Sequence, residues 1–177
     1  MIRLRNLLFS LTVINILTAA VASGQTATAV SATGYIYAEV IPVFSASETA
    51  QLNFGRFSPG PQGGEIILTP QNTVMVSGTV YAGSGTRNAA SFYVTGDTDA
   101  AFSISLPDSP VLLTHTSSAR TIRIEDWVSI PSQGVGTGML QNGFQVVYVG
   151  ATLKVGTLND NPVGVYTGSY NITFDFN

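Results

Sequence analysis

The residue types that could carry chemistry are few in this sequence. His115 is the only histidine, and it stands in a polar stretch after Leu113. Nucleophilic or metal chemistry would need partners for it, but the chain has no second histidine and no cysteine. We interpret His115 as a solvated loop residue and predict no catalytic residue, no cofactor-binding residue, no metal ligand and no enzymatic activity.

Two acidic pairs are the next candidates. Glu125 and Asp126 precede the only tryptophan, Trp127, and could form half of a carboxylate site or a platform for a sugar. We favour charges that keep an edge strand from pairing. Asp97 and Asp99 have the spacing that begins a Ca²⁺ loop, but the later glutamate of such a loop is missing. We interpret them as part of a hairpin turn.

The first residues predict export. Arg3 and Arg5 precede an apolar run over residues 7–20, and small residues follow. This pattern is typical of a secretory signal peptide with a cut after Ala22 or after Gly24. The alternative is an uncleaved membrane anchor, which the short run disfavours. A bacterial lipoprotein is excluded because it needs a cysteine at the cut.

We therefore divide the chain into a signal peptide, residues 1–24, and a single domain, residues 25–177. Removal of the signal peptide leaves five basic and ten acidic residues and changes the net charge from −3 to −5. Scattered negative charge argues against nucleic acid or an anionic membrane surface as a partner. No later run reaches membrane-spanning length. Without cysteine, stability must come from packing and strand pairing.

The strongest pattern in the domain is the period of two over residues 164–177. One side of this stretch is apolar and mostly aromatic, and it holds Tyr166, Tyr170, Ile172, Phe174 and Phe176. Alternating polar residues fill the other side. This pattern predicts one long, half-buried β-strand against the core.

A second alternating stretch, residues 30–40, predicts a first strand, and we expect it to neighbour the last one. Its small apolar residues fall on one face. Tyr35 and Tyr37 fall on the other, where they cover the edge of the sandwich or form an exposed aromatic pair for binding; we favour the former.

Between these ends the pattern predicts many short strands and no helix. They cover residues 65–69, 73–81, 90–94, 102–106, 111–114, 121–130, 144–148 and 151–155. We expect a hairpin between 90–94 and 102–106, and we expect the last two runs either to pair or to form one strand kinked at Gly150. Residues 45–50 are interpreted as a polar connector, and residues 82–88 and 131–138 as Gly-rich loops. The spacing indicates an all-β sandwich or barrel.

Four motifs, in this order, resemble the DUF4402 family of small secreted bacterial domains of unknown function. They are Leu52-Asn53-Phe54-Gly55, then Phe92-Tyr93-Val94-Thr95-Gly96, then Val149-Gly150-Ala151-Thr152-Leu153-Lys154-Val155, and finally residues 164–174. Ala151 departs from the pattern, which has a second glycine there. The resemblance implies an immunoglobulin-like, pilin-like antiparallel β-sandwich at a bacterial surface, and it brings no catalytic residues.

Two functions remain open. In the first, the protein is a structural subunit of a surface fibre, with residues 25–33 filling a groove in the next subunit and the C-terminal strand bordering that groove. In the second, it is a stand-alone surface adhesive or binding domain whose loops 82–88 or 131–138 bind a protein or glycan. We expect the periplasm or cell surface of a bacterium as the location, and no membrane insertion after signal cleavage.

Overall fold

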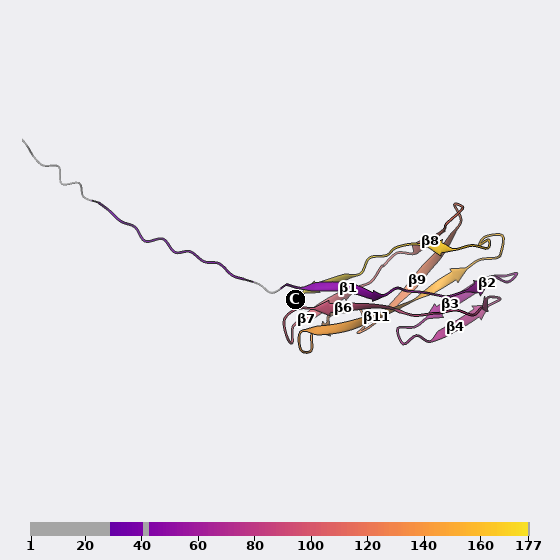
Figure 1. Ribbon diagram of the computed structural model, residues 1–177, viewed down its shortest axis with the longest axis horizontal. Helices are drawn as coiled ribbons and strands as arrows, with labels where there is room; N and C mark the ends of the chain where they lie inside the picture. The colour runs from indigo at the N-terminus through magenta and orange to yellow at the C-terminus, as the bar shows by residue number, and fades with distance from the viewer. Residues whose placement is uncertain (1–28, 41–42, 177) are drawn as a thin grey trace, which may run out of the picture. The chain divides into compact units, whose positions relative to one another are not determined.

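A computed structural model describes residues 29–40 and 43–176, so the predicted signal peptide lies outside the described part. The chain divides into two units, Met1–Glu39 and Val40–Asn177. Residues 29–40 contain no strand (Figure 1), and the structure leaves every one of them exposed. Within one chain, residues 30–40 therefore form no strand beside the last one, which leaves the other predicted arrangement, a strand donated to a neighbouring copy. Alternation makes a segment able to pair, but it does not supply the partner.

Every strand of the described residues lies in the second unit, and these residues include no helix that could span a membrane. The strands are β1 (Ser45–Ala50), β2 (Phe57–Ser58), β3 (Gly64–Leu68), β4 (Val74–Gly78), β5 (Tyr81–Ala82), β6 (Ala90–Thr95), β7 (Ala101–Ser105), β8 (Val111–His115), β9 (Thr121–Ile130), β10 (Gly134–Met139), β11 (Phe144–Val155), β12 (Tyr166–Thr167) and β13 (Thr173–Phe176).

In the part of the chain that is described, eight strands form the main sheet, in the order β1-β6-β11-β9-β8-β12, with β3 beside the second half of β11 and β4 beside β3. A second sheet has the order β10-β7-β13, and β2 pairs with β5. All these pairings are antiparallel. The predicted all-β, antiparallel, sandwich-like fold is confirmed.

Strand β11 organises the main sheet because it changes its neighbour along its length. Its first half pairs with β6 as far as Val149, and its second half pairs with β3 from Ala151 onwards. Gly150 stands at the change. The two runs at 144–148 and 151–155 thus form one strand, which was one of the two predicted alternatives. On its other side β11 pairs with β9, where a bulge places Asp126, at φ 53°, and Trp127 opposite a single residue of β11.

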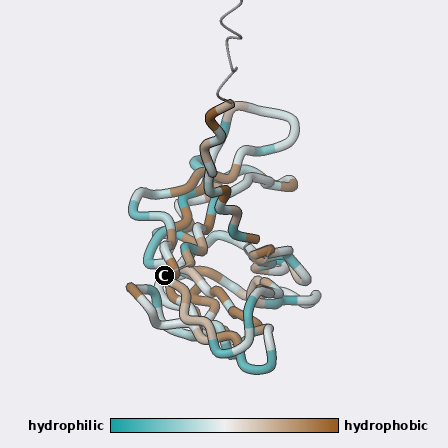
Figure 2. The backbone as a smooth tube through the Cα atoms, turned by 90° about the vertical axis from the view of Figure 1, so that its left-hand side faces the viewer, coloured by the Kyte–Doolittle hydropathy of each residue, from teal (hydrophilic) through white to brown (hydrophobic). Residues whose placement is uncertain are grey.

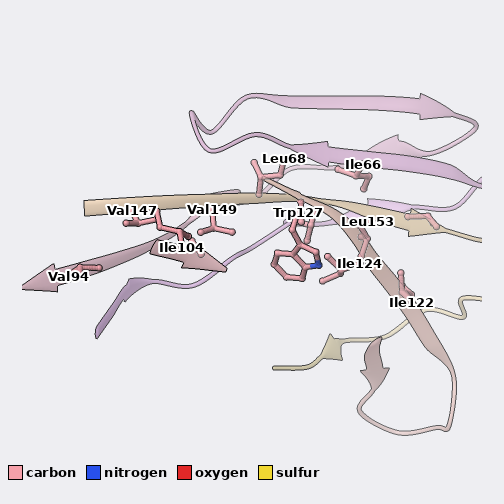
Figure 3. Packing of buried hydrophobic residues seen from close by; sticks show 14 of the residues in the cluster. Ile66, Leu68, Val94, Ile104, Ile122, Ile124, Trp127, Val147, Val149 and Leu153 are labelled. Carbon is pink, nitrogen blue, oxygen red and sulfur yellow. The ribbon is translucent and has the colours of Figure 1, made fainter. Parts of the chain in front are cut away.

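The core lies between the two sheets. Phe102 and Ile104 of β7 are almost fully buried, together with Val94, Val147 and Val149 of the main sheet (Figure 3). Alternation explains this arrangement, because each strand turns every second side chain inward. Polar segments lie in many of the connecting loops (Figure 2).

Two strands were predicted as connectors. Residues 45–50 form β1, an edge strand with one partner and almost no buried side chain, so it needs no apolar pattern. Its hydroxyls bind its neighbour instead, as with Ser45 Oγ and Thr95 Oγ1 at 2.8 Å. Residues 131–138 include most of β10. Gly138 there reflects close packing, because a Cβ at this position would overlap the ring of Phe102.

The predicted hairpin of residues 90–94 with 102–106 was also wrong. Strands β6 and β7 belong to different sheets, and the connection between them crosses from one sheet to the other. It is held by the chain before β11, since Asp99 N–H donates to the Leu140 carbonyl at 2.8 Å and Leu140 N–H donates to the Ala100 carbonyl at 2.9 Å. Turn residues in the sequence show where the chain changes direction, but they do not show which strand the next strand will pair with.

The long C-terminal strand is divided. β12 pairs with β8 in the main sheet and β13 pairs with β7 in the second sheet, while residues 168–172 belong to no strand. The predicted inward side is largely correct, because Tyr166, Tyr170, Ile172 and Phe174 pack against the core. One stretch therefore connects the two sheets and contributes side chains to both.

Candidate functional site

A groove of about 620 Å³ lies between two segments that are distant in the sequence. One wall is formed by residues 52–59. The other wall is formed by residues 162–166 with Gly168 and Tyr170. The floor is made of apolar side chains from three strands of the main sheet: Val111, Leu113, Ile122, Ile124 and Leu153.

The first wall is fixed by short polar contacts. Asn53 and Asn88 exchange backbone hydrogen bonds of 2.9 and 3.0 Å, and Phe54 is buried in the core. Gly55 has φ 72°, a conformation that favours glycine, and its N–H donates to Asn53 Oδ1 at 2.8 Å. This wall is therefore shaped before anything occupies the groove.

The second wall has an unused side. Among the described residues, β12 pairs only with β8 and β13 only with β7. The outer sides of β12 and β13 are thus open strand edges, and residues 168–172 connect them. A free edge offers backbone N–H and C=O groups to another strand. The groove consequently combines an apolar floor with an edge that can accept one more strand.

His115 supports this wall and does not sit in a solvated loop, so that interpretation was wrong. It ends β8, and its ring packs edge-on against Tyr166 at 5.0 Å between centroids. Nδ1 accepts a hydrogen bond from Ser117 N–H at 2.9 Å, and Nε2 lies 3.2 Å from the Val163 carbonyl oxygen. The Nε2–H tautomer satisfies both contacts. A Cβ at Gly164 would overlap this ring.

A family model matches the part of the chain that forms the strands. The family model described as a domain of unknown function (DUF4402) matches residues 44–176. The chain belongs to the DUF4402 family. The match covers every strand from β1 to β13. No match was found among the curated proteins or among the solved structures.

Within the DUF4402 domain, three of the four motifs that carry the resemblance contribute residues to the groove. The motif that ends at Gly55 lies on the first wall, and the motif at 164–174 supplies much of the second. Leu153, on the floor, belongs to the third motif. In the fibre-subunit hypothesis the C-terminal stretch borders a groove, and in the structure Gly164, Val165, Tyr166, Gly168 and Tyr170 line this one. The sequence analysis did not identify the floor, because the floor residues alternate like any core residues.

The acidic pair of the DUF4402 domain lies on a central strand, so the interpretation as protection of an edge was wrong. Lys154 of β11 meets three carboxylates: Glu65 at 2.7 Å, Asp126 at 3.2 Å and Glu125 at 3.4 Å. The hydrogen bond to Glu65 is the largest cause that raises the pKa of Lys154 above its usual value. Burial opposes this shift, and Asp126 and Glu125 add to it. The cluster joins β3, β9 and β11 on the outer face of the main sheet.

Replacing Lys154 with methionine should lower the free energy of unfolding by roughly 1–2 kcal/mol, because three carboxylates lose their shared cation. Since the pKa of Lys154 is raised, its contribution is complete below about pH 10 and disappears only as the pH rises through the higher folded value. Urea unfolding at pH 7 measures the loss. Arg123→Met is the matched control, because Arg123 makes one longer ion pair with Glu125, at 3.7 Å. Equal effects of the two variants would contradict the shared role of Lys154.

Four candidates of the DUF4402 protein remain, Asp97, Asp99, Tyr35 and Tyr37, and none of them lines the groove. Asp97 and Asp99 are in the connection from β6 to β7, and no group of metal-ligating side chains forms among the described residues. Tyr35 and Tyr37 are 98% and 85% exposed, so they do not cover an edge. The hydroxyl of Tyr37 donates to Glu39 Oε2 at 3.0 Å.

The DUF4402 domain also has an apolar patch that the sequence analysis did not identify. Tyr93 and Phe144 stack at 5.5 Å on the outer face of β6 and β11, and Tyr148 lies opposite Ile130 of β9. All four side chains are about 40% exposed. The sequence analysis did not gather these residues, because the register that brings them together is set by pairings distant in the sequence.

Proposed function

We propose that the protein is a non-enzymatic, secreted structural subunit of a bacterial surface fibre. In this proposal, the N-terminal segment of one copy lies as a strand in the groove of the next copy. The observation that carries the proposal is the match between a groove with an open strand edge and an unpaired alternating segment. The predicted signal peptide, residues 1–24, supports export to the periplasm or cell surface.

The inserted segment in this proposal is residues 30–40. The segment first expected, residues 25–33, lies partly outside the described residues, and the alternation continues to Val40. Val30, Ile36 and Val40 share one face with smaller residues and are nearly fully exposed. As a strand, eleven residues span about 36 Å. Their apolar face suits the floor of Ile122, Ile124 and Leu153, and their backbone suits the open edge.

Ile36→Asp tests this proposal. Ile36 is 99% exposed, so the substitution should leave the domain's melting temperature unchanged. It should abolish assembly, because a carboxylate would be buried on an apolar floor. The measurement is size exclusion with light scattering on residues 25–177. The original sequence should form concentration-dependent ladders, and Ile36→Asp should be monomeric.

Thr33→Asp is the matched control, because Thr33 lies on the opposite, polar face of the alternating segment, and this variant should still form ladders. An excess of a synthetic peptide of residues 30–40 should cap the ladders of the original sequence. A protein that stays monomeric at every concentration and ignores the peptide would refute the fibre subunit.

A stand-alone adhesive or binding domain is the second candidate function. The exposed patch around Tyr93, Phe144 and Tyr148 favours it, because contiguous exposed apolar surface often marks an interaction site. In that case the partner would be another surface protein or a glycan. A monomer that binds such a partner through this patch, and loses binding on Tyr93→Ala, would support this candidate.

A further inference from the structure

Besides Arg87 Nε, two buried polar groups of the domain lack a hydrogen-bond partner within the described residues. One is the indole Nε1 of Trp127, whose side chain is only 8% exposed. The other is the hydroxyl of Tyr170. The two rings are neighbours, with 4.6 Å between their centroids. Trp127 is the only tryptophan and comes from the β9 bulge, whereas Tyr170 comes from the unpaired residues between β12 and β13.

Other polar groups in the same region are satisfied. The hydroxyl of Tyr166 donates to the Pro162 carbonyl at 2.8 Å, and the side-chain amide of Asn161 donates to the Thr121 carbonyl at 3.0 Å. Buried donors without acceptors are costly, so proteins rarely retain them. Two such groups side by side therefore indicate that their acceptors come from outside the domain.

One of these two groups lines the groove, and the other packs directly behind it. Tyr170 lines it directly, next to floor residues Ile124 and Leu153. The nitrogen of Trp127 is on the side of its ring that faces Ile124 (Figure 3). An occupant of the groove that reaches Tyr170 therefore also comes close to the ring of Trp127.

We infer that Trp127 and Tyr170 recognise the backbone of the strand inserted from a second copy, by donating hydrogen bonds to its carbonyl oxygens. This inference rests on the proposed function. An indole N–H can only donate, and a tyrosine hydroxyl can donate, so the occupant must bring acceptors. An extended peptide brings a neutral acceptor at every residue.

An anionic ligand fits less well. Burial, and secondly the negative charge of Glu48, raises the pKa of Tyr170, which keeps its hydroxyl protonated at neutral pH. The same burial and the same negative charge would disfavour a carboxylate or phosphate beside this hydroxyl. Neutral backbone carbonyls do not carry that penalty.

Tyr170→Phe tests the inference, with Tyr166→Phe as the matched control. Both variants are made in the Ile36→Asp protein, which keeps its own segment from assembling, and the probe is the synthetic peptide of residues 30–40. Trp127 fluorescence reports binding. Tyr170→Phe should weaken peptide affinity about 3- to 10-fold, the loss of one hydrogen bond, without lowering the melting temperature. Tyr166→Phe should lower the melting temperature and leave affinity within about twofold, because its hydroxyl is bound inside the domain.

A second measurement needs neither tyrosine variant. The single indole N–H signal in a ¹H–¹⁵N spectrum should move on peptide addition, and its exchange with water should slow. Peptide binding with equal affinity to Tyr170→Phe and an unchanged indole signal would overturn the inference and leave the fibre subunit standing. A melting temperature lowered by Tyr170→Phe at unchanged affinity would overturn it too, because the hydroxyl would then have a partner inside the domain. No peptide binding at all to the Ile36→Asp protein would overturn both proposals.

Discussion

A chain that ends at Ser169 does not fold. This truncation removes β13, which is the only partner of β7 on that side of the second sheet among the described residues. It also removes three side chains that pack against the core, Tyr170, Ile172 and Phe174. Phe174 contacts both sheets, with its ring 5.8 Å from that of Phe92 and 6.0 Å from that of Phe102.

The expected loss is comparable with the whole stability of a domain. Three large apolar groups at ~1.5–3 kcal/mol each contribute roughly 5–9 kcal/mol as an upper bound. Net stabilities of domains are about 5–15 kcal/mol. Circular dichroism and thermal melting of a 25–169 fragment test this prediction. A fragment that ends at Asp175 is the control. It loses only the last two residues, of which Phe176 is half-exposed, so it should melt cooperatively. A soluble 25–169 fragment with a cooperative melt would refute the prediction.

Gly150→Val should also prevent folding. At Gly150, β11 exchanges β6 for β3 as its neighbour, and the end of β3 crosses closely over it. A Cβ there would overlap the carbonyl oxygen of Leu68 and lie 2.7 Å from Thr69 C and 2.8 Å from Pro70 N. All three atoms belong to the backbone, so no side chain can move aside. We expect a loss of more than about 4 kcal/mol, as for the most severe core substitutions.

Urea unfolding measures this effect, and Gly34→Val is the matched control. Nothing lies within 4 Å of a Cβ at Gly34, and its neighbours are exposed. The control should therefore unfold at the same urea concentration as the original sequence. If the Gly150→Val protein also unfolds at the urea concentration of the original sequence, β3 can shift away from β11, contrary to our expectation.

The strands that could be predicted from sequence are those with one buried face. β9 has the predicted bounds, Thr121–Ile130, because Ile122 and Ile124 alternate with polar residues. β11 was predicted as two runs that could join at Gly150. A strand with one buried face needs an apolar residue at every second position. Such alternation in a sequence therefore indicates a strand of this kind.

Edge strands, and the partner with which each strand pairs, could not be predicted in this way. β1 has no buried face, and β10 contains glycines that usually indicate loops, so neither has an apolar pattern. Residues 30–40 have a clear pattern, but their partner is absent from the described part of the chain. The groove was missed for a related reason, since its walls come from two segments, residues 52–59 and 162–170, that are more than 100 residues apart in the sequence.

The central place of β11 also bears on how fast the chain can fold. Strands β3, β6 and β9 all precede β11, and its pairs join residues as distant as Leu68 and Ala151. Such non-local pairing is slow, and refolding times of milliseconds to seconds are typical for all-β domains of this kind. Until residue 155 is available, the apolar faces of the earlier strands lack their main partner and are open to aggregation. We therefore expect refolding to depend on protein concentration unless a chaperone shields these strands until β13 has been added.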